Sequence, residues 1–365
     1  MTDRIDPAHA AYAFANRFVN VLVRLPNGTP LQTAGRCGGM SYSVLDHLTA
    51  GRDVPAWPAG LFTPDRVPPD GHVLAEHLRR RQLDSFRSRS ALRFLTWSAL
   101  PDGDVGPVAG VRTRTRRELP GILRALVQGR PVVLGMVVAR HLLRSGDNHQ
   151  VVATGFTRDD ATGQVVLTLL DPNTPGREVT LVETPDGWRA DNGRLWRGFF
   201  RHAYAPRTPP ALPSASRRPS ARVRADEPLA LAHVATGRLL VVADGAPVLR
   251  ATGTTTWVPT ADTSLLADGA TIHLFSDGRA LTVVGAAPAV RTADDGGPDA
   301  PAQDAATDTW RVVVDGGGPW RQGSRVRLLH TATGQLLAGT PEGPTTSWTP
   351  APCTWWTVAA GPAAP

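Results

Sequence analysis

One cysteine stands at a place in the sequence where a thiol could act as a nucleophile. Cys37 lies in LQTAGRCGGMSYSVLDHL and immediately precedes a segment with the apolar spacing of a helix. The free N–H groups and the dipole at a helix N-terminus favour the thiolate form. Gly38 and Gly39 would leave room for a substrate backbone, and the N–H groups there could hold an oxyanion. Gln32, five residues before the cysteine, could add a side-chain donor to that oxyanion.

A histidine and a carboxylate lie where two predicted strands meet. His149 opens the segment HQVVATGF, and Asp171 ends QVVLTLLD, with Asn173 two residues beyond it. Pro172 takes the chain out of the strand and leaves the Asp171 carboxylate at the strand edge. If the two strands pair through the turn at 157–163, His149 and Asp171 become neighbours. A carboxylate beside an imidazole fixes its tautomer and supports the imidazolium, which in turn stabilises a thiolate.

Helices followed by strands must position these side chains. Apolar spacing and turn residues predict helices over 39–51, 72–86 and 116–129. Extended segments separated by Gly-, Asp- and Pro-rich turns follow at 131–139, 149–156, 164–171, 177–183 and 195–204. This order indicates an α+β domain with an antiparallel sheet rather than a Rossmann-type alternation.

The C-terminal part of the chain is repetitive and predicted to be all-β. LALAHVATGRLLVV (229–242) matches VRLLHTATGQLLAG (326–339), and IHLFSDGRALTVVG (272–285) is a weaker middle copy. Three short-strand units suggest a threefold fold in which no unit buries its own apolar face. Five tryptophans are expected to fill much of the core, with partners for their indole N–H groups: Trp257, Trp310, Trp348, Trp355 and Trp356.

Length and composition divide the chain into two domains. A protein of 365 residues is expected to have two or three domains. Residues 206–225 contain many Pro and Arg and few large apolar residues, so we predict a linker there. It separates an N-terminal domain at 1–205 from a C-terminal domain at 226–365.

Composition excludes several classes of protein. Two cysteines cannot form a disulfide framework or a Cys-rich zinc site, and no HExxH motif occurs, so we expect no metal and no cofactor. The longest strongly apolar run, 131–139, is too short to cross a bilayer. The N-terminus has no pattern of a secretory signal, so a cytoplasmic location is expected.

The net charge of +7 resembles the charge of a nucleic-acid-binding protein, but its origin weakens that interpretation. The chain has no lysine, so all 39 basic residues are arginine. Arginine is therefore the default cation, and the arginine runs at 79–81 and 112–117 carry no interleaved aromatics. We expect no nucleic-acid partner.

The order of the motifs resembles that of the papain-like cysteine peptidases, in particular the C39-like branch. A helix-borne cysteine comes first, then GRPV opening a strand, then HQVVATGF, then an apolar strand ending in Asp-Pro; the resemblance covers roughly residues 30–173. It implies Cys37 as nucleophile, His149 as general base and then acid, and Asp171 as the residue that orients His149. Asn173 is the alternative orienting residue. The reaction implied is hydrolysis of a peptide or amide through a thioester.

The C-terminal repeats are similar to those of MIR-type β-trefoils, through VRLLHTATG and LALAHVATG. This implies a binding module for a protein or a glycan, although the Gln-x-Trp signature of ricin-type lectins is missing. Two other functions stay open for the N-terminal domain. It could be an inactive papain-like scaffold that serves as an interaction protein, or an acyltransferase that uses the same cysteine.

Overall fold

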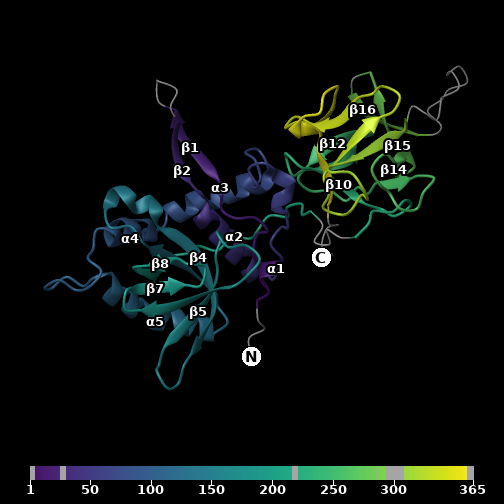
Figure 1. Cartoon of the computed structure of the whole chain (residues 1–365). Coiled ribbons are helices and arrows are strands. Elements are labelled where there is room, and N and C mark those ends of the chain that lie inside the picture. Colours follow the sequence, from purple (N-terminus) through teal and green to yellow (C-terminus); the bar gives the residue numbers. More distant parts are fainter. Residues whose placement is uncertain (1–4, 25–29, 216–220, 286, 293–307, 360–365) are drawn as a thin grey trace, which may run out of the picture. The chain divides into compact units, whose positions relative to one another are not determined.

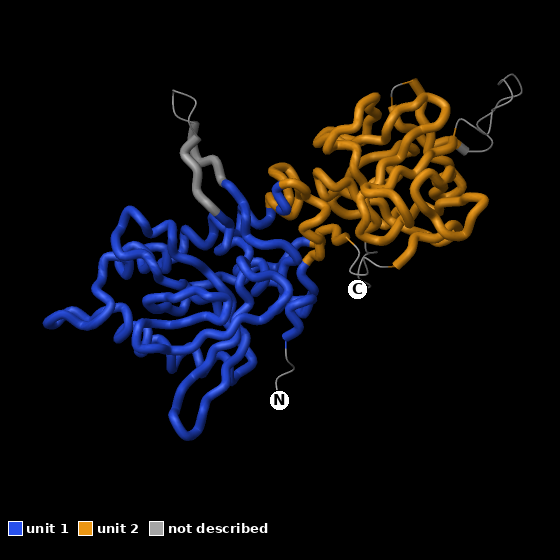
Figure 2. Tube along the Cα trace, viewed as in Figure 1, with its two compact units in different colours: residues 1–54, 65–67, 77–210 blue, residues 55–64, 68–76, 211–365 orange. Residues whose placement is uncertain are grey.

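The computed structural model describes residues 5–24, 30–215, 221–285, 287–292 and 308–359, with the backbone alone at 20–24, 30–34 and 292. The chain divides into two compact units (Figure 2). Unit 1 comprises residues 1–54, 65–67 and 77–210, and unit 2 comprises residues 55–64, 68–76 and 211–365. Unit 1 combines helices with an antiparallel sheet, and unit 2 is built mainly of antiparallel strands (Figure 1).

Unit 1 contains a short hairpin, a set of helices and one seven-stranded sheet. The hairpin is β1 (Val19–Arg24) and β2 (Pro30–Ala34). The helices are α1 (Pro7–Ala10), α2 (Cys37–Thr49), α3 (Val73–Phe86, its first four residues in unit 2), α4 (Arg89–Ser98), α5 (Val111–Val127) and the 3-10 helix η2 (Leu142–Asp147). The sheet has the order β8-β7-β6-β5-β4-β3-β9. Its strands are β3 (Val132–Val137), β4 (His149–Arg158), β5 (Val165–Leu170), β6 (Val179–Thr184), β7 (Gly187–Ala190), β8 (Leu195–Trp196) and β9 (Gly198–Arg201).

Helices cover both faces of this sheet. Ile122 of α5 belongs to a buried cluster that includes Val151 and Ala153 of β4, so α5 packs on that face. Because side chains alternate along a strand, Val152 faces the other way, where it lines a small cavity together with Met40 of α2. The predicted helices 39–51, 72–86 and 116–129 correspond to α2, α3 and α5, whereas α4 and β7 were not predicted.

The sheet curls until its two edges meet. β8 and β9 are the edge strands at opposite ends of the strand order, yet only Arg197 separates them in the chain. Arg197 donates its backbone N–H to Val137 O of β3 at 2.9 Å, which continues the β3–β9 pairing toward β8. The prediction of one strand over 195–204 is therefore wrong, because this segment serves both edges of the sheet.

Unit 2 shows a threefold pattern in its core. Trp257, Trp310 and Trp356 are fully buried. Their indole N–H groups donate to the backbone oxygens of Leu240, Leu281 and Leu337 at 2.9, 2.9 and 3.0 Å, respectively. Each of these leucines lies three residues after the glycine of its sequence repeat. The strands of unit 2 are β10 (Ala230–His233), β11 (Leu239–Ala243), β12 (Ala246–Arg250), β13 (Val258–Thr260), β14 (Thr271–Ser276), β15 (Arg279–Val284), β16 (Ala287–Thr292), β17 (Trp310–Val314), β18 (Val326–His330), β19 (Leu336–Gly339), β20 (Pro344–Ser347) and β21 (Trp356–Ala359), with 3-10 helices η1 (Ala59–Phe62) and η4 (Pro352–Thr354).

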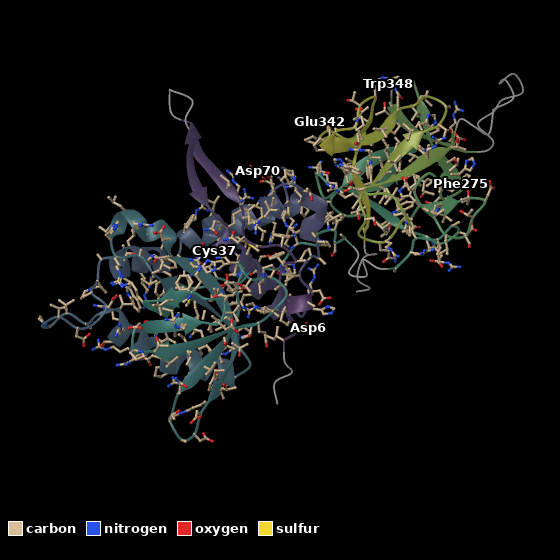
Figure 3. The ribbon with its side chains drawn as sticks, viewed as in Figure 1. Asp6, Cys37, Asp70, Phe275, Glu342 and Trp348 are labelled. Atoms are coloured by element: carbon tan, nitrogen blue, oxygen red, sulfur yellow. The ribbon has the colours of Figure 1, made fainter. Side chains whose placement is uncertain are left out.

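The other two predicted core tryptophans lie elsewhere. Trp348 is 70% exposed (Figure 3), so its assignment to the core is wrong. Trp355 is half-buried, with the Arg327 guanidinium 3.6 Å from its ring centroid. Trp320, which the repeats did not single out, is fully buried in the core instead.

Residues from the first third of the chain complete unit 2. Trp57 donates its indole N–H to Pro213 O at 2.8 Å, and its ring meets the His72 ring edge-on at 4.7 Å. A Cβ at Gly237 would lie 2.4 Å from the His72 ring. In the segment predicted as a linker, Ala215 forms a β-bridge with Ala359, while residues 216–220 lie outside the described residues.

Candidate active site

The candidate nucleophile begins helix α2. Cys37 is its first residue (Figure 3), and Arg36 is the preceding N-cap. Arg36 is buried, its guanidinium lies 4.5 Å from the centroid of the Phe18 ring, and its backbone N–H donates to Asn16 Oδ1 at 2.5 Å. These contacts fix the entry of the chain into α2 and therefore the position of the thiol. Cys37 itself is partly exposed.

The antiparallel pairing of β4 and β5 brings His149 next to Asp171. Val152 lies opposite Leu170, so the start of β4 lies beside the residues that follow β5. His149 Nε2–H donates to Asp171 Oδ1 at 2.7 Å, and both side chains are buried. Pairing of these two strands through the turn at 157–163 predicted that His149 and Asp171 would be neighbours. Because Nε2 is used by Asp171, the other ring nitrogen, Nδ1, is left for the thiol.

Cys37 and His149 interact directly, and the interaction changes the protonation of both. Burial alone would raise the pKa of the Cys37 thiol. The hydrogen bond and charge of His149, with backbone N–H donors from Gln150 and Gly38, outweigh burial and hold that pKa below its ordinary value. Burial would lower the pKa of His149, but the bonds and charges of Asp171 and Cys37 raise it to about 10. The arrangement therefore favours a thiolate–imidazolium pair at neutral pH.

Asp171 is held as an anion by several donors. Its Oδ1 also accepts the Asn173 backbone N–H at 2.8 Å, and its Oδ2 accepts the Asn192 side-chain amide at 2.9 Å. Burial acts to raise the pKa of Asp171, but His149 and these donors lower it overall. The Asn173 amide nitrogen lies 3.3 Å from His149 Nε2. Of the two predicted orienting residues, Asp171 makes the shorter contact, and Asn173 holds Asp171 through its backbone.

The two glycines after Cys37 serve helix packing. A Cβ at Gly39 would lie 2.1 Å from Leu78 O of α3, and a Cβ at Gly38 would lie 2.4 Å from Ser85 Oγ. Gly39 N–H is already bonded to Gln82 Oε1 at 2.8 Å. The expectation that these glycines make room for a substrate is therefore wrong, because the space they leave is filled by α3. Gly39 N–H is also not available as an oxyanion donor.

The remaining predicted residue, Gln32, can be placed only by its backbone. It lies in β2 and pairs with Val21 of β1. Its side chain lies outside the described part of the structure, so its role as an oxyanion donor stays a prediction.

Two further side chains, which the sequence did not single out, contact the His149–Asp171 pair. Trp196 stacks on His149, with ring centroids 5.8 Å apart and planes 11° apart. Asn192, in the turn between β7 and β8, bonds both Asp171 Oδ2 and Thr174 Oγ1 at 2.9 Å. The sequence assigned no role to Asn192 and placed Trp196 in a predicted strand, and no local pattern distinguishes either residue.

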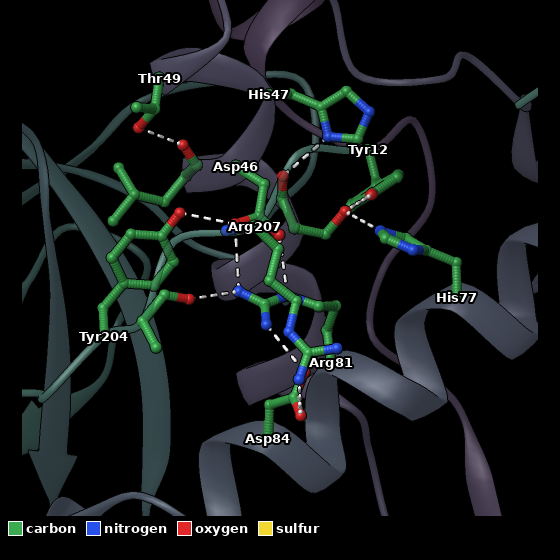
Figure 4. Close-up of polar contacts among 12 residues, drawn as sticks. Tyr12, Asp46, His47, Thr49, His77, Arg81, Asp84, Tyr204 and Arg207 are labelled. Atoms are coloured by element: carbon green, nitrogen blue, oxygen red, sulfur yellow. Dashed lines mark hydrogen bonds and ion pairs between the residues drawn. The ribbon is translucent and has the colours of Figure 1, made fainter. Parts of the chain in front are cut away.

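A buried ionic network fixes the second half of α2. Asp46 is buried and accepts the Tyr204 hydroxyl at 2.6 Å and the Arg207 backbone N–H at 2.9 Å (Figure 4). Arg81 of α3 pairs with it, with Nε 2.7 Å from Asp46 Oδ2. Breaking a buried pair of this kind leaves an uncompensated charge, which makes the network a rigid support for α2.

Two other classes of site have no candidate in the described residues. Across those ranges, no group of three or more His, Cys, Asp and Glu side chains could hold a metal ion. No helix of the described part of the chain is long and apolar enough to span a bilayer.

Comparisons with known proteins do not identify a family. No family model and no curated protein matches the chain. An SDF2-like protein from Arabidopsis thaliana aligns with 38% of this chain, and the alignment covers 94% of the Arabidopsis chain, at 18% sequence identity and a TM-score of 0.31. A Caenorhabditis elegans protein of unknown function matches 38% of this chain and 96% of its own at 15% identity and a TM-score of 0.32. Lysenin in complex with phosphocholine matches 64% of this chain and 77% of its own, at 12% identity and a TM-score of 0.30. Scores this low establish no shared fold, so function has to be argued from the geometry of the site.

Proposed function

We propose that unit 1 is a papain-like cysteine hydrolase that cleaves peptide or amide bonds. The observation that carries the proposal is the hydrogen-bonded series from the thiol of the half-buried Cys37 through the buried His149 to Asp171. A nucleophile, a base and an orienting carboxylate in this order form the arrangement that activates a thiol for acyl transfer.

The proposed reaction proceeds through a thioester. The Cys37 thiolate adds to the substrate carbonyl carbon, and the carbonyl oxygen becomes an oxyanion. When the oxyanion collapses, the C–N bond breaks and the leaving nitrogen takes the proton of the His149 imidazolium. Water then loses a proton to the neutral imidazole as it adds to the thioester. Collapse of this second adduct releases the carboxylic acid and restores the thiolate–imidazolium pair.

Each neighbour of the pair has a distinct task in this scheme. Asp171 keeps the Nε2 proton of His149 in place, so that Nδ1 faces the sulfur and carries the transferred proton. Trp196 covers one face of the imidazole, which shields the His149–Asp171 bond from water. Gln32 is the proposed side-chain donor for the oxyanion, as the resemblance to papain-like enzymes implies.

Intact-protein mass spectrometry after brief treatment with iodoacetamide tests the proposal, followed by a screen of fluorogenic peptides. We expect one preferred adduct on Cys37, with Cys353 as the internal reference thiol, and loss of both the adduct and peptide hydrolysis in Cys37→Ala. Preferential labelling of Cys353 would contradict the proposal and favour an inactive scaffold. Adding hydroxylamine during turnover distinguishes transfer to an amine from transfer to water.

We also propose that unit 2 is a β-trefoil that serves as a binding module. The three equivalent tryptophan-to-backbone bonds support it, because they repeat with the period of the sequence units. His233 and His330 each bond a threonine three residues later through Nδ1, at 2.9 Å, which gives both repeat histidines a structural role. A glycan array probed with the full-length Cys37→Ala protein tests for a sugar ligand, and a blank array favours a protein ligand.

A further inference from the structure

Asn16 bonds the chain on both sides of the candidate active site. Its side-chain oxygen Oδ1 accepts the Arg36 backbone N–H at 2.5 Å, and Arg36 directly precedes Cys37. Its own backbone N–H donates to Pro172 O at 2.9 Å, and Pro172 directly follows Asp171. One residue therefore connects the neighbour of the nucleophile to the neighbour of the orienting carboxylate.

These two bonds close a ring of contacts around the site. Cys37 bonds His149, and His149 bonds Asp171 at 2.7 Å. The chain then continues from the carboxylate to Pro172, and from there the bonds of Asn16 lead back to the residue before the thiol. Among the non-covalent bonds of this ring, those of Asn16 involve no group that moves a proton in the proposed reaction. They can therefore fix the separation of sulfur and imidazole while the reacting groups change their charge.

The side chain of Asn16 lies closely against the chain that leads to the nucleophile. Gly35 has a φ of +81°, and a Cβ there would lie 2.5 Å from Asn16 Nδ2, so a side chain at this position would displace the amide. Gly35 N–H donates to Phe18 O at 2.7 Å, which anchors the same turn a second time. Arg36 is buried, and removing the acceptor of a buried N–H is costly. The bond from Arg36 to Oδ1 is thus part of a tightly packed contact.

We infer that Asn16 is a positioning residue, which holds Cys37 at the distance from His149 at which the thiolate–imidazolium pair forms. The inference rests on the proposed function, because it concerns the same pair. Separating the two charges weakens their attraction: at an effective dielectric constant of about 20, a change from about 4 to about 6 Å lowers the ratio of thiolate to thiol roughly tenfold. A contact that served stability alone would leave this ratio unchanged.

Titration of the Cys37 thiolate by its ultraviolet absorbance tests the inference, with the full-length Cys353→Ala protein as the parent. Asn16→Ala removes Oδ1 but keeps the backbone bond to Pro172. We expect its thiolate transition to move up by about one pH unit, which corresponds to the tenfold loss. Asn16 is half-buried, so this variant should fold, and Asn16→Ser, whose side chain is too short to replace Oδ1, should shift in the same direction.

Asn16→Asp tests whether the accepted hydrogen bond is what matters. It keeps an oxygen in the place of Oδ1, and about 0.5 M KCl screens the charge that it adds. We expect this variant to titrate close to the parent. Its charge acts against a thiolate, so recovery can come only from the restored acceptor. An Asn16→Asp transition that coincides with that of Asn16→Ala would overturn the role of the hydrogen bond.

Tyr12→Phe is the matched control from the same segment. The buried Tyr12 hydroxyl lies 2.7 Å from Ser43 Oγ of α2 (Figure 4), so this variant also loses a buried contact with α2 but keeps both bonds of Asn16. It should lower the midpoint of urea unfolding, as Asn16→Ala does, without moving the thiolate transition. The positioning role is wrong if Asn16→Ala titrates like the parent or if Tyr12→Phe shifts equally. A parent protein with no thiolate at neutral pH would refute the proposed function, and the inference with it.

Discussion

The thiolate–imidazolium pair can be tested directly by removing its base. His149 is the charge that lowers the pKa of the Cys37 thiol against the opposing effect of burial. Two unit charges about 4 Å apart interact by about 4 kcal/mol at an effective dielectric constant of 20. This energy corresponds to nearly a thousandfold in the ratio of thiolate to thiol. In His149→Ala burial remains and the charge is gone, so we expect the thiolate to be almost absent at pH 6.

The assay measures thiolate absorbance at 240 nm against pH, in a Cys353→Ala background and with Cys37→Ala as the blank. This measures the thiolate population itself, because alkylation rates also depend on the nucleophilicity of the thiol. The wild type should show thiolate at pH 6, and its transition should move to higher pH in His149→Ala. His141→Ala, an exposed histidine eight residues earlier, is the matched control. If the transition of His149→Ala coincides with that of the wild type, the ion-pair reasoning is wrong.

Three further predictions follow from contacts around the site. Asn192→Ala removes a donor to the carboxylate that orients His149. We expect kcat for the best peptide to fall about tenfold with little change in KM; a tenfold rise in KM with kcat unchanged would indicate a binding role instead. Gly39→Ala forces a Cβ against the backbone of α3 and should lower the free energy of unfolding by about 1–3 kcal/mol in a urea titration. The control Gly121→Ala, helical and with open space around its Cβ, should raise it by about 0.5–1 kcal/mol; similar effects at both positions would refute the packing argument. The last prediction concerns the free energy of unfolding that the Cys37–His149 pair contributes, which is the difference between the wild type and a Cys37→Ala/His149→Ala double variant. This contribution should be greatest between about pH 6.5 and 8.5, because the folded and unfolded states then hold the same number of protons on these two groups. It should decline at lower pH, where the unfolded chain binds one proton more, and again as pH rises through about 10, where His149 loses its proton; a flat difference over this range would contradict the pKa directions.

The sequence was most informative where the chemistry depends on local pairing. Apolar spacing predicted a helix over 39–51 directly after Cys37, and α2 begins two residues earlier, at Cys37 itself. His149 and Asp171 meet because one short turn joins their strands, so the register carries both side chains to the same end. Neither inference requires knowledge of how distant segments pack.

The sequence was least informative where a residue acts through a distant neighbour. Gly38 and Gly39 look like a substrate-binding surface when read beside Cys37 alone, and only the approach of α3 reveals why they lack side chains. The short helix α4 was missed because only Arg87 and Ser88 separate it from α3, and neither glycine nor proline marks the break. Trp348 was assigned to the core by residue type, although its position after β20 leaves it in solvent.

Closure of the sheet explains why Asn192 and Trp196 could not be found from sequence. The segment after β7 leaves one edge of the sheet at β8 and joins the opposite edge at β9, with Arg197 as the only residue between them. β9 pairs with β3, and β3 with β4, so this crossing carries Trp196 to the His149 ring. The turn just before it carries Asn192 to Asp171. The same curling that closes the sheet therefore places Trp196 against the His149 ring and the Asn192 amide against the Asp171 carboxylate. A substitution that straightened the chain at Arg197 would alter the candidate active site without touching Cys37, His149 or Asp171.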